Sequence, residues 1–91
     1  MTPKVVIEKI IEVIQRLGEE SGCESQLIVD TTCPLKDLPW FDSLMGTHSM
    51  TELSDVLVIE IPDNLDIFKT KGKELSICEA ANKLLEHLTG K

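Results

Sequence analysis

The start of the chain carries apolar residues at helical spacing. They recur every three or four positions, so that they fall on one face of a helix. Thr2 can cap this helix, and Pro3 suits its first turn, where a missing backbone N–H costs nothing. Because glycine favours helix ends, the pattern predicts a helix over Thr2–Leu17 that stops at Gly18.

A second amphipathic pattern lies near the end of the chain. Over Leu75–Leu88 the apolar residues again return every three or four positions. Ser76 and Glu79 stand at the spacing of a capping box, in which each side chain binds the backbone N–H of the other residue. We therefore predict a helix over this range.

The middle of the chain is less regular. Gly18–Phe41 is rich in Gly, Ser, Asp, Thr and Pro, which predicts a long connection with a few apolar anchors. Asp42 is a good N-cap, and apolar residues near helical spacing follow it, which predicts a second major helix. The β-branched run Val56–Ile61 is compatible with a helix or a strand, and Pro62 ends either one.

The stretch before the last helix predicts little regular structure. We expect one short helical turn around Leu65, Ile67 and Phe68, and an exposed basic loop over Lys69–Lys73. The sum is an all-α fold with three substantial helices, one short helix, and a long loop between the first two major helices.

Composition indicates one domain over residues 1–91. Hydrophobic residues make up 42% of the 91, enough for one compact core and too many for wholesale disorder. Three cysteines without a CxxC pair indicate free thiols in a reducing cytoplasm. No apolar run reaches transmembrane length, and Glu8 and Glu12 argue against a secretion signal at the start.

Negative charge is concentrated in the middle of the chain. From Asp37 to Asp66 there are seven acids and no Lys or Arg, while the other residues carry nine of each sign, so this stretch holds the whole net charge of −7. This balance argues against duplex nucleic acid and anionic membranes as partners, because both repel acids. A concentrated field can instead steer a basic partner; the plainer interpretation is a solvated surface.

Few residues indicate catalysis or metal binding. His48, His87 and the cysteines lack zinc-ligand spacing, and no phosphate-binding glycine loop is present. A triad of Ser43, His48 and a carboxylate can be written, but so small a chain leaves little room for a substrate cleft, and we predict no enzyme. Asp42-Ser43-Leu44 is more informative, since a serine that opens a helix meets unpaired N–H groups and a dipole that favours negative charge. An ordinary helix start is the alternative explanation.

The sequence resembles the acyl carrier proteins, which carry a phosphopantetheine arm. Their interval between the modified serine and an Ile-Pro-Asp element is similar to that from Ser43 to Pro62. The likeness covers most of the chain, including Thr32–Leu38, Phe41–Leu44, the acidic second helix, Glu60–Asp63 and Leu75–Ile77. The stretch Leu38–Leu44 resembles a divergent bacterial branch. The resemblance implies a monomeric four-helix bundle.

The resemblance also implies a role for each matching residue. Ser43 is expected to receive 4′-phosphopantetheine from coenzyme A, transferred by a holo-acyl-carrier-protein synthase, which is a phosphopantetheinyl transferase. The thiol of the arm then carries an acyl group as a thioester. Asp42 caps the helix and contacts the synthase, and Leu44 lies beside the arm. The residues expected to face basic docking sites on acyltransferases, ligases and synthases are Leu44, Glu52, Asp55, Glu60 and Asp63.

Several positions depart from the family pattern and point to a specialised carrier of a lipid or fatty-acid-like pathway. His48 and Ser49 stand where members have an acid and a bulky apolar residue, and the loop Lys69–Glu74 is longer. Small polar residues at Gly46, Thr47 and Ser49 predict a wider space beside the arm or an oxygenated cargo. The alternatives are an aminoacyl, D-alanyl or peptidyl carrier, and an acidic helical adaptor that binds a basic protein without a prosthetic group.

Overall fold

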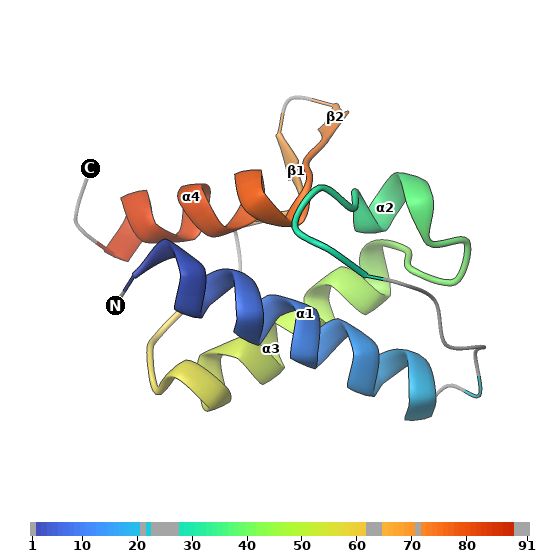
Figure 1. Ribbon diagram of the computed structural model, residues 1–91, viewed down its shortest axis with the longest axis horizontal. Helices are drawn as coiled ribbons and strands as arrows, with labels where there is room; N and C mark the ends of the chain where they lie inside the picture. The colour runs from blue at the N-terminus through green and yellow to red at the C-terminus, as the bar shows by residue number, and fades with distance from the viewer. Residues whose placement is uncertain (1, 21, 23–27, 62–64, 71, 89–91) are drawn as a thin grey trace.

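The computed structural model describes residues 2–20, 22, 28–61, 65–70 and 72–88 (Figure 1). Within these residues the chain forms four helices and one pair of short strands. They are α1 Pro3–Glu20, α2 Pro34–Asp37, α3 Ser43–Leu57, β1 Lys69–Thr70, β2 Lys73–Glu74 and α4 Ile77–Leu88. The prediction of a small, mostly helical protein is confirmed.

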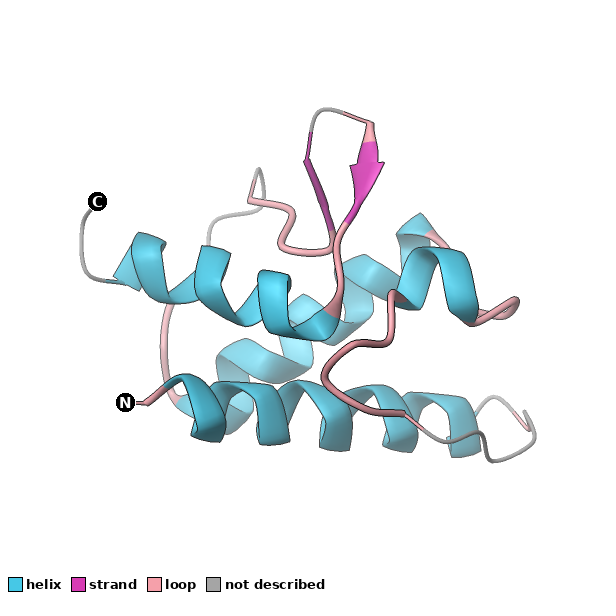
Figure 2. Cartoon of the chain, turned by 45° about the horizontal axis from the view of Figure 1, so that its top comes forward, coloured by secondary structure: helices cyan, strands magenta, loops and turns pink. Residues whose placement is uncertain are grey.

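The first helix, α1, organises the core. It packs against both α3 and α4, which run back against its direction (Figures 1 and 2). Its apolar stripe is buried, as the helical spacing predicts. The prediction that Gly18 stops the helix is wrong, since α1 continues to Glu20. Gly18 is instead buried against Trp40, where an added Cβ would stand only 3.0 Å from ring atom Cζ2.

The predicted N-cap of α3 is confirmed. An Asp42 Oδ1 atom accepts a hydrogen bond from the backbone N–H of Met45 at 3.0 Å, which satisfies one of the unpaired donors at this helix end. At the other end, the helix stops at Leu57 and Val58 adopts a left-handed conformation. The ambiguous run Val56–Ile61 is therefore divided: its first two residues complete the helix and the rest leave it.

The expected helical turn around Leu65, Ile67 and Phe68 is wrong. These residues form a bend, in which a side-chain oxygen of Asp66 accepts the backbone N–H of Phe68 at 2.9 Å. Ile67 and Phe68 are both fully buried. The bend thus sends two bulky neighbours into the core, and a side-chain hydrogen bond replaces the helical one.

The predicted basic segment Lys69–Lys73 is exposed at Lys69, Gly72 and Lys73, as expected, but its ends form a β-hairpin rather than an irregular loop. Strands β1 and β2 are antiparallel, with Lys69 opposite Glu74 and Thr70 opposite Lys73. The hairpin extends away from the helices (Figure 2). Gly72 has φ +82°, a value that glycine adopts without steric cost, so it permits the tight turn.

The long loop is held by the start of α4. The carbonyls of Thr32 and Asp30 accept the backbone N–H groups of Ile77 at 2.9 Å and Cys78 at 2.8 Å. These donors belong to the first turn of α4, where no helical carbonyl is within reach. The loop therefore completes the cap of a helix that follows it by more than forty residues in sequence.

The predicted capping box of α4 is confirmed. Glu79 N–H donates to the Ser76 hydroxyl at 3.2 Å, and Ser76 N–H donates to the Glu79 carboxylate at 3.0 Å. Lys83, further along α4, donates to the backbone carbonyls of Asp66 and Lys69. The helix is thereby tied to the bend and the hairpin. None of the described helices is long and apolar enough to cross a membrane.

Candidate functional site

The candidate serine stands at the start of α3. Ser43 is the first helical residue after the cap, and the carbonyl of Asp42 accepts the backbone N–H of Gly46 at 2.9 Å, so the helix is regular from its first turn. The aligned peptide dipoles place partial positive charge at this end. The side chain of Ser43 lies outside the described part of the structure. Leu44, next to it, is 63% exposed.

Aromatic packing holds the loop that leads to Ser43. Phe41 is buried and its N–H donates to the carbonyl of Leu38 at 3.0 Å, which closes a tight turn. The Phe41 ring packs edge to face against two other rings, with centroid distances of 5.2 Å to Phe68 and 5.7 Å to Trp40. Trp40 in turn covers Gly18 of α1. These contacts anchor the residues just before the helix, so the start of α3 has a defined position.

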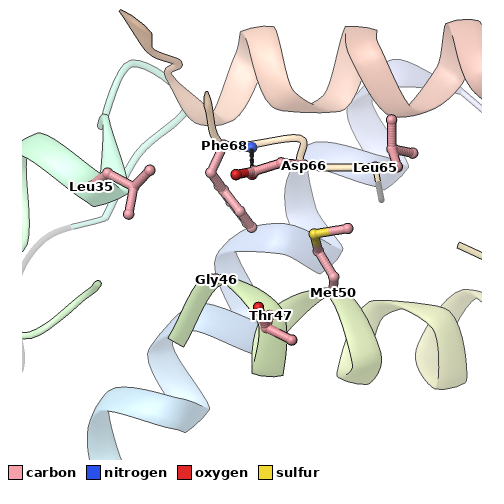
Figure 3. Close-up of a pocket in the computed structure, with 7 residues that line it drawn as sticks. All are labelled: Leu35, Gly46, Thr47, Met50, Leu65, Asp66 and Phe68. Atoms are coloured by element: carbon pink, nitrogen blue, oxygen red, sulfur yellow. Dashed lines mark hydrogen bonds between the residues drawn. The ribbon is translucent and has the colours of Figure 1, made fainter. Parts of the chain in front are cut away.

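A small cavity opens about one helical turn beyond Ser43 (Figure 3). Its volume is about 110 Å³. The ring of Phe68 points toward Gly46, and the side chain of Met50 points toward Leu65. The described residues that line it come from α2, α3 and the bend, and are Leu35, Gly46, Thr47, Met50, Leu65, Asp66 and Phe68.

The small residues that the sequence singled out have different places. Gly46 and Thr47 line the cavity, as the idea of a wider space beside the arm requires. Ser49 does not line it, because its side chain is fully buried and its hydroxyl donates to the carbonyls of Met45 at 2.9 Å and Gly46 at 3.1 Å. The prediction that Ser49 widens this space is therefore wrong, because its hydroxyl is bonded within the helix and its small size serves packing.

The acids predicted to face a partner are not equivalent. Asp55 and Glu60 are exposed. Glu52 is half-exposed, and its carboxylate pairs with the guanidinium of Arg16 on α1 at 2.8 Å. This ion pair joins α3 to α1, so Glu52 already has an internal role. Asp63 lies outside the described residues.

Candidates for catalysis or metal binding find little support. His48 is exposed on α3. Within the described residues, no three His, Cys, Asp or Glu side chains gather closely enough to hold a metal ion. Cys33 and Cys78 are half-buried free thiols. Burial raises the pKa of the Cys33 thiol, and the nearby carboxylates of Asp37 and Glu79 add to this effect, so it is a poor nucleophile at neutral pH.

Two features escaped the sequence analysis. The cavity depends on Asp66 and Phe68, whose spacing two apart is typical of an Asx turn and could have indicated the bend. The second feature is Val58, which is 87% exposed at the end of α3. It lies within the β-branched run Val56–Ile61, and that pattern gives no indication that one of its residues is exposed. Comparison with family models, with curated proteins and with solved structures gave no match.

Proposed function

We propose that this chain is a carrier protein that bears 4′-phosphopantetheine on Ser43 and presents an acyl group, bound as a thioester, to partner enzymes. The observation that carries the proposal is the juxtaposition of a serine at the start of a fifteen-residue helix with a cavity that begins at Gly46, one turn further on. The first supplies an attachment point and the second supplies space for what is attached.

The start of α3 suits a phosphodiester. In the loading step, the Ser43 hydroxyl oxygen attacks the phosphorus of coenzyme A that bears the pantetheine, the bond to 3′,5′-ADP breaks, and the hydroxyl proton passes to a base of the transferase. The phosphodiester keeps one negative charge. Unpaired N–H groups and the helix dipole at Ser43 stabilise such a charge. Asp42 holds the helix start in place through Met45.

The arrangement of helices also agrees with a carrier of the acyl-carrier type. In this proposal α1, α3 and α4 are the three major helices of the bundle. The short helix, α2, precedes Ser43, whereas the sequence predicted a short helix after the second major one. Leu35 of α2 lines the cavity, so this helix contributes to the space beside the arm.

The cavity favours a small cargo with a polar group. An apolar cavity of about 150 Å³ takes up benzene. The space of about 110 Å³ therefore has room for the first few atoms of a chain. Asp66 on the wall is an acceptor for a hydroxyl or an ammonium group. A hydroxyacyl group, as a specialised lipid pathway would supply, is therefore the first candidate cargo. An aminoacyl group is the second.

The partners follow from the exposed side chains on α3 and just after it. In this proposal Leu44, Asp55 and Glu60 contact basic docking sites on the transferase and on acyltransferases, ligases or synthases in the cytoplasm. Glu52 contributes less, because a partner would have to displace Arg16 from it. The chain itself catalyses no reaction and acts as a carrier.

Mass spectrometry of the intact protein tests the proposal. The purified chain is incubated with coenzyme A and a phosphopantetheinyl transferase of broad specificity. We expect a mass gain of one phosphopantetheine in the wild type and none in Ser43→Ala. Ser76→Ala is the matched control, because Ser76 also stands at a helix start, and it should load normally. No gain in the folded wild type, or a gain in Ser43→Ala, would overturn the proposal.

A series of loaded cargoes identifies the chemistry of the attached group. Hydroxyacyl, aminoacyl and unsubstituted acyl forms of equal length are prepared on the same protein, and their Tm values are compared with that of the unacylated arm. If Asp66 contacts the cargo, the hydroxyacyl or aminoacyl form gains more stability than the unsubstituted one. Asp66→Asn should reduce the gain of an aminoacyl cargo most, because it removes the negative charge.

A further inference from the structure

Val58 closes α3 in a conformation that valine rarely adopts. It has φ 55° and ψ 52°, the left-handed region in which a β-branched side chain crowds its own backbone. Its N–H donates to the carbonyl of Asp55 at 3.3 Å, and Ile59 N–H donates to the carbonyl of Ser54 at 3.0 Å. This is the pattern of a helix end that is usually built on glycine. The turn therefore needs the backbone of residue 58 and gains nothing from its side chain.

The same side chain is also placed in water. Val58 is 87% exposed, compared with 41% for Val5 on α1. A single exposed apolar residue is ordinary on a protein surface. A residue that is both exposed and held in an unfavourable backbone conformation is not, because either glycine or asparagine would serve the turn at lower cost. Strain that the local structure does not need points to a role in function.

The surroundings of Val58 indicate what it contacts. It borders an open surface hollow of about 340 Å³, lined by Ser54, Asp55, Val58, Ile59 and Glu60. The two acids are exposed, Ile59 is half-buried, and none of these lining residues is basic. The hollow is thus an apolar spot bordered by negative charge. This combination is complementary to an apolar pocket bordered by Lys or Arg.

We propose that Val58 is an apolar anchor of a protein-docking surface at the C-terminal end of α3, and that the partner presents an apolar socket with a basic rim. Val58 enters the socket while Asp55 and Glu60 face the rim. The proposal goes beyond the carrier function, because it does not require an arm on Ser43. It adds a residue to the partner-facing set that the charge pattern did not indicate.

The dimensions allow one partner to cover both ends of α3. The helix has 15 residues and is therefore about 22 Å long. A standard interface buries about 800 Å² on each partner, which corresponds to a patch roughly 30 Å across. A partner that reaches Leu44 at the start of the helix can thus also reach Val58.

Paired valine substitutions test the anchor. Val58→Thr keeps the shape and the β-branching but exchanges a methyl for a hydroxyl, and Val5→Thr makes the same change at an exposed position of α1. Proteins of the native cell that bind the immobilised chain at low salt and elute at high salt are purified, and these are the probes. We expect Val58→Thr to weaken Kd at least tenfold for one of them and Val5→Thr to change it less than twofold. Equal effects of the two substitutions would overturn the proposal.

Two further measurements test the strain at residue 58 and the identity of the partner. Val58→Gly should raise Tm by about 4 °C through relief of the left-handed strain, yet bind as poorly as Val58→Thr. A fall in Tm would overturn the argument from strain. A photo-crosslinking residue at position 58 should attach to a partner peptide that contains Lys or Arg, and a crosslink between two copies of this chain would refute the proposed occupant. Binding by Ser43→Ala should match the wild type, so that failure of the carrier function leaves this test intact.

Discussion

Replacement of Gly46 by alanine tests the packing around the candidate site. Gly46 is buried in α3, and its N–H donates to the carbonyl of Asp42 at 2.9 Å. A Cβ at this position would lie 3.8 Å from Cδ2 of Phe68 and 3.9 Å from Cε1 of Phe41. These are ordinary van der Waals distances. Alanine therefore fits without displacing either ring.

Two contributions favour the alanine. Within a helix, alanine is more favourable than glycine by about 1 kcal/mol. The new methyl also contacts two aromatic rings, and its burial adds up to about 0.8 kcal/mol. We expect Gly46→Ala to raise the free energy of unfolding by about 1–1.5 kcal/mol. For a chain of 91 residues this corresponds to an increase in Tm of roughly 4–10 °C.

Urea unfolding followed by far-ultraviolet circular dichroism measures the effect. The midpoint should rise while the slope m stays constant, since the surface exposed on unfolding hardly changes. Gly18→Ala and Gly72→Ala are matched controls with the same chemical change. At Gly18 the new Cβ would lie 3.0 Å from Trp40 Cζ2, and at Gly72 the backbone has φ +82°. Both controls should lower the midpoint, Gly18→Ala because the ring must move and Gly72→Ala because alanine is strained there.

A midpoint that is unchanged or lower in Gly46→Ala would refute this description of α3. Stabilisation of equal size in Gly18→Ala would show that helix propensity alone decides, without the packing geometry. The carrier proposal adds a functional consequence, because the methyl narrows the cavity. Gly46→Ala should gain stability as the unloaded protein and lose part of the Tm increase that a bound cargo gives.

Four further predictions concern contacts outside the cavity. Ser76→Ala removes a helix cap and should lower the free energy of unfolding by about 1 kcal/mol in urea titrations. Hydrogen bonding to Ser76, mainly to its backbone N–H and less to its side chain, lowers the pKa of Glu79. The resulting contribution to stability is complete above the unfolded pKa of about 4.3 and is lost as the pH falls below that value. Glu79→Gln should therefore flatten the pH dependence of Tm in this acidic range. Arg16→Met breaks the half-exposed ion pair with Glu52 and should lower the free energy of unfolding by at most about 1 kcal/mol. If charge is responsible, the difference from the wild type should largely disappear in about 1 M NaCl. Because burial and neighbouring carboxylates raise the pKa of Cys33, iodoacetamide should alkylate it more slowly in the folded protein than in urea, as peptide mass spectrometry can measure.

Local signals were sufficient wherever a helix end is stabilised by its own neighbours. Asp42 caps α3, and Ser76 and Glu79 cap α4, as their spacing predicted. In each case the donor and the acceptor lie within three residues of one another, so the interaction is present in the sequence before any tertiary contact forms.

Local signals failed where distant residues compete with them. Gly18 was predicted to end the first helix. Instead the helix continues past it, and the Trp40 ring packs where a side chain at Gly18 would lie. Ile67 and Phe68 looked like part of a helical turn, yet the core takes both side chains and Asp66 stabilises a bend instead. Helix propensity is worth less than the burial of two large apolar side chains, so packing decided these segments.

The sequence by itself determined where the major helices lie, where negative charge gathers, and that a serine opens the helix after a capping aspartate. These properties depend on residues one or two helical turns apart. Only the tertiary structure decided the cavity beside Gly46, the pair between Arg16 and Glu52, the loop carbonyls that cap α4, and the exposed position of Val58. Each of these features depends on how the whole chain packs, because packing brings distant residues into contact and leaves others exposed to water. The spacing of neighbouring residues does not determine either outcome.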